Sequence, residues 1–352
     1  MNFGFAFAPP LRGVCYYDDA QNNIVRGYVS IEHLLAAWRG FAKGKKNHED
    51  AALFQMRLLE NLFALHDDLR LKTYVHGPYR AFVVSDPKRR DIHKASVRDR
   101  VLHHLIYQVL SPYFDTHFIH DAYSCRLEKG THRAIDRFRA FGRKVSQNDT
   151  RTCWVLKCDI KKFFASIDHS VLKNILARHI EDKDILALCA KVIDSFETNK
   201  GSAVGLPLGN LTSQLFVNVY MNEFDQFAKH TLKAKHYVRY ADDFVFLSQD
   251  REWLVSLLPQ TRSFLWEQLR LTLHPDKISI STFASGVDFL GWVHFLDHRV
   301  MRTTTKRRVF RRIKQMEGKE ETVQSYLGLM SHGNTRKEQE KVKQLLKQMP
   351  QT

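Results

Sequence analysis

The sequence predicts an α+β fold, and three observations lead to that prediction. Residues 30–72 repeat apolar side chains every three or four positions, which is typical of amphipathic helices. The clearest of these positions are Leu53, Met56, Leu59, Leu62 and Leu65. Residues 151–248 then alternate between strand and helix patterns, and the C-terminal 45 residues are basic and helical in pattern. A chain of 352 residues is long for one domain and suits two or three subdomains around a shared core.

The individual elements follow from local periodicity and from turn residues. Alternating apolar residues bounded by Gly and Pro predict strands, and a return to helical spacing predicts helices. Asp168 has the side chain and the position to cap the helix that follows it. In chain order the sequence predicts a hairpin over 77–93, a helix over 97–113, a strand over 151–160, a helix over 168–180, a loop over 199–210, a helix over 211–230 and a hairpin over 236–248.

The charge balance predicts a polyanionic partner. Lys and Arg number 54 against 38 Asp and Glu, which gives a net charge of +16. The basic residues cluster over 88–100 and 297–314 rather than spreading evenly, so nucleic acid is the first candidate. Five cysteines without a CxxC pair argue against a disulfide framework and a zinc ribbon, and favour the reducing cytoplasm. No apolar run approaches the roughly 20 residues of a membrane span, so no membrane association is expected.

Three acidic residues stand where apolar segments end. Asp159 ends a predicted strand, and Asp242 and Asp243 form the tip of a predicted hairpin much later in the chain. Carboxylates are the ligands that Mg²⁺ prefers, and phosphoryl transfer depends on metal ions more than on covalent help from protein. An Asp-Asp pair is also common in ordinary turns. The metal-site interpretation therefore requires a fold that aligns the two strand ends.

Seven segments together resemble the motifs of reverse transcriptases of the bacterial, group II intron-like branch. YADDF resembles the signature hairpin of that family, and the aromatic residue five positions after Asp159 fits its first palm motif. The segments keep the family's order over roughly residues 75–330. They are KRRDIHKASVRDRV (88–101), YSCRLEKGTHRAID (123–136), LKCDIKKFFASIDH (156–169), GLPLGNLTSQLFVN (205–218), YADDF (240–244), LHPDKISI (273–280) and GVDFLGW (286–292).

The resemblance implies a right-hand polymerase fold with fingers, a palm built on an antiparallel sheet, and a helical thumb. The implied division is an N-terminal helical extension over 1–74, fingers and palm over 75–295, and a basic thumb over 296–352. It implies synthesis of DNA on an RNA template from deoxynucleoside triphosphates. Template RNA and the primer or cDNA strand are the implied partners.

The same resemblance implies roles for individual residues. Asp159 and Asp242 would bridge two Mg²⁺ ions, for which Mn²⁺ can substitute, with the Ile160 carbonyl assisting and Asp243 less directly involved. The implied nucleotide-binding residues are Lys88, Arg90, Phe164, Leu208, Gly209, Gln214 and Lys277. The implied primer or template contacts are Phe289, Gly291, Trp292, Lys306, Arg307, Arg311 and Arg312.

Several of these residues also have plain structural readings. Phe164 fits a steric gate against the ribose 2′-hydroxyl, and it fits an ordinary core position. The 88–90 cluster could be a solvated charge run, and the 289–292 segment could be a strand that packs on the palm. Leu208 departs from relatives that carry Gln at this position, and a leucine cannot hydrogen-bond near the nascent base pair. We therefore expect lower fidelity, especially opposite adenine.

The subfamily and its rivals follow from smaller features. GNLTSQ and SYLGLMSHGNT (325–335) resemble the enzymes of diversity-generating retroelements, which work with a small basic accessory variability determinant. An antiphage-defence enzyme or a retron enzyme would have the same chemistry with a different template. A non-catalytic RNA-binding protein on the same scaffold is a further alternative, which the three acids disfavour. A palm-fold nucleotidyl cyclase or primase would share the acids but not GLPLGNLTSQ or DFLGW.

Overall fold

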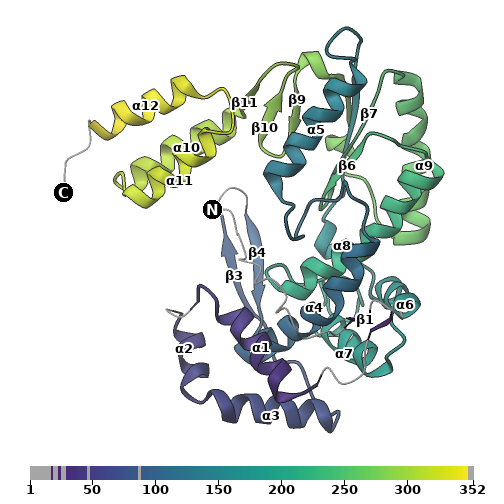
Figure 1. Cartoon of the computed structure of the whole chain (residues 1–352), viewed down its shortest axis with the longest axis vertical. Helices are drawn as coiled ribbons and strands as arrows, with labels where there is room; N and C mark the ends of the chain where they lie inside the picture. The colour runs from purple at the N-terminus through teal and green to yellow at the C-terminus, as the bar shows by residue number, and fades with distance from the viewer. Residues whose placement is uncertain (1–16, 19–22, 25–28, 46–47, 86–88, 348–352) are drawn as a thin grey trace.

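A four-stranded antiparallel sheet forms the centre of the fold (Figure 1). The computed structural model describes residues 17–18, 23–24, 29–45, 48–85 and 89–347. The strand order in this sheet is β6-β7-β5-β8, and all three neighbouring pairs are antiparallel. Its strands are β5 (Trp154–Asp159), β6 (Tyr237–Tyr240), β7 (Asp243–Ser248) and β8 (Ser279–Thr282). Helices combined with antiparallel strands confirm the predicted α+β class, and both β5 and the β6–β7 hairpin were predicted.

Both faces of this sheet are buried. Successive side chains of a strand point to opposite faces, so Phe244 and Phe246 join one hydrophobic core while Val245 and Leu247 join another. Helix α5 (Thr131–Val145) packs on the second face. Each fully buried Phe contributes about 1.5–3 kcal/mol, so this alternation strongly fixes the strand register. The helices of the first core include α4 (Val97–His117), α6 (His169–His179), α7 (Lys183–Asp194), α8 (Leu211–Gln226) and α9 (Arg251–Leu269).

Side-chain caps fix where these helices begin. The Asp168 carboxylate accepts a hydrogen bond from the Val171 backbone N–H over 3.0 Å at the start of α6, as predicted. The Asp250 carboxylate accepts from the Trp253 N–H over 2.9 Å and does the same for α9. Helix α8 ends in a π-helical turn over Phe227–Thr231, so the predicted helix over 211–230 is confirmed with a change of geometry at its end.

Three helices confirm the predicted N-terminal helical segment, but the predicted apolar face is wrong in its first half. The helices are α1 (Ile31–Ala42), α2 (Glu49–Met56) and α3 (Leu58–Arg70). Leu62 and Leu65 are fully buried. The exposed positions are Leu53, Met56 and Leu59. The chain leaves helical geometry at Arg57 (φ −122°, ψ 42°), so the apolar positions of α2 and α3 do not share one face.

Smaller strand groups flank the central sheet. The hairpin of β3 (Arg80–Val84) and β4 (Arg90–Lys94) was predicted. A three-stranded antiparallel sheet was not predicted. Its strands are β9 (Val287–Phe289), β10 (Trp292–His294) and β11 (Arg299–Met301). The remaining short elements are the pair β1 (Tyr17–Asp18) and β2 (Asn23–Ile24) and the 3₁₀ turns η1 (Phe163–Ser166), η3 (Pro275–Lys277) and η4 (Phe283–Ser285).

Three C-terminal helices extend to one side of the molecule (Figure 1). They are α10 (Thr303–Gln315), α11 (Glu320–Met330) and α12 (Arg336–Lys347). They share a small core of their own, which reaches the rest of the protein through Trp292, Met301 and Ile135. An ion pair of 2.5 Å between Lys306 and Glu338 joins α10 to α12. No helix in the described part of the chain is long and apolar enough to cross a bilayer.

Candidate active site

The β6–β7 hairpin brings the three predicted acids to one end of the central sheet. Asp159, the last residue of β5, is the register partner of Asp243, the first residue of β7. Cβ atoms of directly opposed residues lie about 4.5–5.5 Å apart in antiparallel pairs. The backbone N–H of Ile160 donates to the Asp242 carbonyl over 3.2 Å, which holds the hairpin tip against the end of β5. The fold therefore aligns the two strand ends, as the metal-site interpretation requires.

Burial and mutual repulsion disfavour ionisation of the two hairpin acids. Burial, and then the neighbouring carboxylates of Asp243 and Asp159, raise the pKa of Asp242 to about 6. Burial also raises the pKa of Asp243, with Lys157 opposing this shift. Two carboxylates that resist losing their protons at the end of an apolar strand are a place where added positive charge is stabilising.

Two lysines already supply part of that positive charge. The Lys277 ammonium donates to Asp159 Oδ1 over 2.6 Å, and Lys157 Nζ lies 3.8 Å from Asp243 Oδ1. Lys157 also donates to the Asp288 carbonyl over 2.8 Å, which ties β5 to β9. Lys277 is held in place by the turn η3, where the His274 N–H donates to the Asp159 carbonyl over 2.7 Å. The structure thus places Lys277, a predicted nucleotide-binding residue, directly on one of the acids.

The donors at this end of the sheet suit a hard divalent cation. Three carboxylates and the carbonyl of Ile160 offer oxygen alone, and a cation beside Asp242 would offset the repulsion that raises its pKa. As these side chains stand, however, the described ranges contain no group of three His, Cys, Asp or Glu residues arranged to hold a metal. The Lys277 ammonium contacts Oδ1 of Asp159, one of the two oxygens of that carboxylate.

A buried ion pair that the sequence analysis missed supports the turn between β6 and β7, which carries Asp242. Arg239 and Asp225 are both completely buried and contact each other through a 2.7 Å bond from Arg239 Nη2 to Asp225 Oδ2. Arg239 Nη1 also donates to the Ala241 carbonyl over 3.2 Å and to Asn218 Oδ1 over 3.3 Å. Ala241 has a left-handed backbone (φ +55°), and it immediately precedes Asp242. The sequence does contain one signal of this ion pair, which is a charged residue, Arg239, inside an apolar strand next to the acids.

The loop before α8 is joined to the β3–β4 hairpin and to η1. The His93 N–H donates to the Leu208 carbonyl over 3.0 Å, and Asn210 Nδ2 donates to the His93 carbonyl over 2.7 Å. The Leu206 N–H donates to the Phe164 carbonyl over 2.8 Å. These contacts bring together three of the predicted nucleotide-binding segments.

Glycine is required at position 209 of this loop. Gly209 has φ +110°, and a Cβ there would lie 2.8 Å from the Ile92 side chain. The contacts described above do not include the remaining predicted nucleotide-binding residues. Arg90 is exposed at the start of β4, Gln214 lies half-buried in the first turn of α8, and Lys88 falls outside the described residues.

The predicted primer contacts of β9 and β10 are packed inside the protein. Phe289 is fully buried in the core beneath the sheet, and Trp292 is buried against the C-terminal helices. A Cβ on Gly333 would lie 2.1 Å from the Trp292 ring, so the indole rests on the backbone there. Gly291 lies in the turn between the two strands at φ +89°. A primer contact in this hairpin therefore has to come from the turn and not from the two aromatic rings.

The predicted basic contacts of α10 differ in their availability. Arg307 and Arg311 are exposed, Arg312 is half-buried, and Lys306 is engaged by Glu338. The exposed arginines could contact a nucleic-acid backbone as the structure stands. Lys306 has a second role in packing α10 against α12.

The chain resembles solved telomerase structures at low sequence identity. The structure of apo telomerase from Candida tropicalis covers 69% of this chain and 60% of its own, with a TM-score of 0.47 and 13% sequence identity. Among curated proteins, YkfC of Escherichia coli is 26% identical over 292 residues, which cover 72% of this chain and 74% of YkfC. The group II intron-encoded protein LtrA of Lactococcus lactis is 21% identical and covers 80% of this chain, which spans only 56% of LtrA.

A family model covers most of the region that contains the acids. The model described as reverse transcriptase (RNA-dependent DNA polymerase) matches residues 85–294. The match includes β5, the β6–β7 hairpin and the loop before α8, so it contains all three carboxylates. The order of the motifs, the meeting of the acids and this match agree, and the chain belongs to the reverse transcriptase family of RNA-dependent DNA polymerases.

Proposed function

We propose that this protein extends a primer with deoxynucleotides on an RNA template at the site formed by Asp159, Asp242 and Asp243. The observation that carries the proposal is the register of β5 and β7, which sets two of these acids opposite each other at a strand end. When bound, two Mg²⁺ ions supply activation of the primer 3′-hydroxyl and neutralisation of the triphosphate. Asp159 and Asp242, with the Ile160 carbonyl, would hold them, and Asp243 would support the site electrostatically.

The test of this proposal is primer extension on poly(rA)/oligo(dT) with Mg²⁺. Incorporation of dTTP by wild-type protein, absent from an Asp159→Ala variant, is the expected result. A protein that binds this duplex but never extends it would instead favour the non-catalytic RNA-binding alternative. A protein that makes cyclic or primer-independent products would favour a cyclase or a primase.

We propose a division of the chain into subdomains that follows the family pattern. We assign residues 1–74 to a helical extension, 75–295 to fingers and palm, and 296–352 to the thumb. The β3–β4 hairpin belongs to the fingers in this assignment, so Arg90 and Lys88 would grip the triphosphate. Guanidinium groups suit phosphate oxygens because they donate two parallel hydrogen bonds. The Lys277 ammonium, next to Asp159, is within the site and is the group that would protonate the leaving pyrophosphate.

Phe164 is proposed as the steric gate. Its ring packs T-shaped against Phe163 at 5.7 Å between centroids and is half-buried, so one side of it can face a bound nucleotide. We expect Phe164→Val to lower the preference for dNTPs over rNTPs by at least about tenfold, since the smaller side chain leaves room for the 2′-hydroxyl. Competitive incorporation of dTTP and UTP measures this ratio. Unchanged discrimination, with normal dTTP incorporation, would leave Phe164 as a core residue.

The exposed arginines of α10 are proposed to contact the primer–template backbone. Arg307→Ala/Arg311→Ala should weaken duplex binding and reduce the slope of log K against log salt by about 1.8, because each lost phosphate contact accounts for about 0.9. Fluorescence anisotropy over a salt series measures the slope. Lys337→Ala/Lys343→Ala on α12 is the matched control, because it removes the same charge from exposed positions. Equal slopes for the two pairs would contradict the assignment.

The biological role that we propose is error-prone copying in a diversity-generating retroelement, with a small basic accessory protein as partner. It is supported by the GNLTSQ segment and by Leu208, whose backbone is fixed by His93 while its side chain is half-buried. An antiphage-defence or retron role uses the same chemistry. Sequencing of RNA that copurifies with wild-type protein and with Asp242→Ala separates them. Recovery of a template-repeat RNA supports the retroelement, whereas a structured non-coding RNA supports a retron.

Leu208 makes a testable contribution to fidelity within this role. Leu208→Gln should reduce misincorporation opposite adenine by about fivefold, which corresponds to one hydrogen bond of about 1 kcal/mol near the nascent pair. Sequencing of cDNA from both proteins on one template gives the two error spectra. Identical spectra would remove the explanation.

A further inference from the structure

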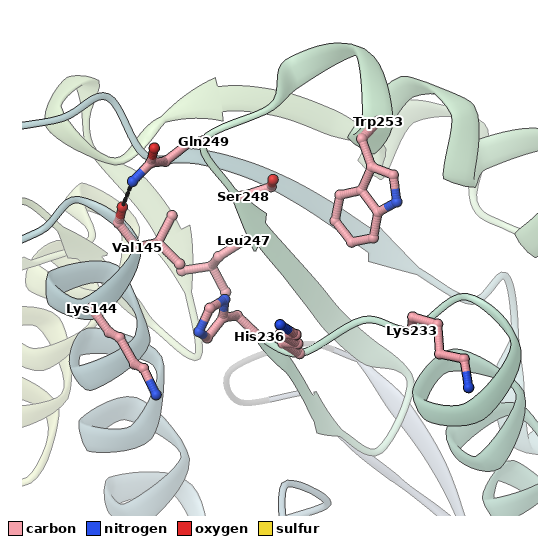
Figure 2. A pocket seen from close by; sticks show the side chains of 9 residues that line it. Lys144, Val145, Lys233, His236, Leu247, Ser248, Gln249 and Trp253 are labelled. Atoms are coloured by element: carbon pink, nitrogen blue, oxygen red, sulfur yellow. Dashed lines mark hydrogen bonds between the residues drawn. The ribbon is translucent and has the colours of Figure 1, made fainter.

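A basic groove lies at the end of the central sheet opposite the three acids (Figure 2). Its volume is about 380 Å³, and its floor includes Leu247 and Ser248. Ser248 ends β7, the strand that begins with Asp243 at the active site. A strand rises about 3.3 Å per residue, so the groove and the acids are separated by roughly 17 Å along the same strand. The groove is therefore a separate place from the site described above.

Positive charge dominates the lining of this groove. Lys144, Lys233 and Lys235 line it, and no acidic side chain does. Within the described residues, none of these three lysines forms an ion pair with a carboxylate. His236 lies on the floor, and burial together with the charge of Lys144 and other nearby cations lowers its pKa. The lysines thus create a local positive potential that the protein itself does not neutralise.

The walls of the groove are held by contacts within the protein. Gln249 Nε2 donates to the Val145 carbonyl over 2.6 Å, which joins the end of β7 to the end of α5 (Figure 2). His236 packs edge-on against Phe141 of α5, with 5.0 Å between ring centroids. The groove is consequently formed before any ligand binds, which avoids part of the ordering cost of binding.

One wall of the groove is the half-buried indole of Trp253. The N-terminal cap by Asp250 fixes the backbone of this residue at the start of α9. The indole packs in part against the large core, and it also lines the groove. In the view of Figure 2, His236 lies between Lys144 and Lys233, and Trp253 lies on the far side of the strand end. An aromatic ring and several lysines that line one groove are the combination that binds single-stranded nucleic acid, with the base on the ring and the phosphates on the ammonium groups.

We propose that this groove binds a single-stranded segment of RNA outside the catalytic cleft. Lys144, Lys233 and Lys235 would contact its phosphates, and Trp253 would stack with one base. The assignment deepens the proposed function, since RNA is the polyanion that the enzyme would have to hold. An acidic peptide would satisfy the lysines, but it would not supply a base with each negative charge, as every nucleotide of RNA does.

The experiment compares charge reversal inside and outside the groove in the full-length protein. Lys144→Glu/Lys233→Glu is the groove variant, and Lys183→Glu/Lys200→Glu, at two exposed positions elsewhere, is the matched control. The probe is single-stranded oligo(U) RNA, and its affinity is measured by anisotropy over a salt series. The groove variant should lower the slope of log K against log salt by about 1.4 more than the control does, because each single-strand phosphate contact accounts for about 0.7.

Ultraviolet crosslinking of the same RNA, followed by peptide mass spectrometry, locates the contact. We expect a uridine adduct on the peptide that carries Trp253, and an affinity loss of about fivefold or more for Trp253→Ala. Thermal unfolding of each variant checks that the fold is retained, and Lys144→Glu/Lys233→Glu provides the answer if Trp253→Ala unfolds. Equal slopes for groove and control variants, adducts confined to other peptides, or equal competition by polyglutamate would overturn the proposal.

Primer extension by the wild-type protein, measured in parallel, separates this inference from the proposed polymerase activity. Extension without a Trp253 adduct overturns the groove assignment alone. A Trp253 adduct without extension supports RNA binding in the groove and overturns the proposed activity.

Discussion

Asp242→Asn is expected to lower primer extension by about 10³-fold or more while leaving the protein folded. The reason is that a metal-bound transition state loses several kcal/mol when one of its carboxylate ligands becomes neutral. Asp276→Asn is the matched control, since Asp276 is a highly exposed carboxylate next to Lys277. Extension assays on both variants and on wild-type protein measure the effect. Comparable activity of Asp242→Asn and wild type would exclude Asp242 from the chemistry.

Without divalent ions, the same substitution is expected to increase the stability of the folded protein. The folded protein binds the Asp242 proton more tightly than the unfolded chain does, because its pKa is about 6 instead of 3.8. Ionisation above pH 6 therefore costs stability, by about 1–2 kcal/mol after allowance for solvent screening. In EDTA at pH 8, Asp242→Asn should be more stable than wild type by that amount. The difference should fade as the pH falls through about 6 and disappear near 3.8.

Thermal unfolding with and without Mg²⁺ provides a readout of metal binding that does not need activity. Mg²⁺ should raise the Tm of the wild-type protein, because binding to the folded state alone is stabilising. The gain should be much smaller for Asp242→Asn, which lacks one charged ligand. An equal gain for the two proteins would place the cation elsewhere.

Asp225→Asn should destabilise the protein by about 3–5 kcal/mol, because it leaves the fully buried Arg239 guanidinium without its counter-charge. Urea unfolding at neutral pH measures this loss. Asp184→Asn is the control, since the Lys72–Asp184 pair is exposed on both sides and should contribute less than about 1 kcal/mol. A loss below 1 kcal/mol for Asp225→Asn would show that Arg239 is solvated in solution.

A double substitution separates the structural role of this pair from its effect on the active site. Arg239→Met/Asp225→Leu removes both charges and should recover much of the stability. It should still reduce kcat by about tenfold, because the Ala241 carbonyl, one residue before Asp242, loses the donor that holds the turn. Wild-type kcat in a stable double variant would reduce the pair to a purely structural contact.

Local patterns in the sequence were sufficient to predict the elements that bear the acids. A strand that ends in Asp159, and a hairpin tipped by Asp242 and Asp243, are short-range signals in which apolar alternation stops at a charge. Their alignment in space was not contained in either segment. It came from the family's motif order, and the register of β5 with β7 agrees with it.

The predictions that failed or were missed depend on contacts between distant segments. The partner of Arg239 lies on another element, so the strand pattern alone reveals an unexplained charge and not an ion pair. The exposed positions Leu53 and Met56 of α2 are separated from the buried face of α3 by a single non-helical residue, Arg57, that periodicity cannot detect. The burial of Phe289 and Trp292 agrees with the alternative interpretation of the 289–292 segment as a packed strand, and the sheet and helices that enclose the two rings were not predicted in detail.

The contact of Lys277 with Asp159 gives the acidic end of the sheet an internal counter-ion. Structural zinc sites collapse when they are stripped, because the ion is part of what holds the chain folded. The tethered ammonium, 2.6 Å from the carboxylate, places a positive charge of the protein's own where the paired strands β5 and β7 bring the acids together. A chelator should therefore silence this protein reversibly, with restoration on adding the ion back and without any refolding step.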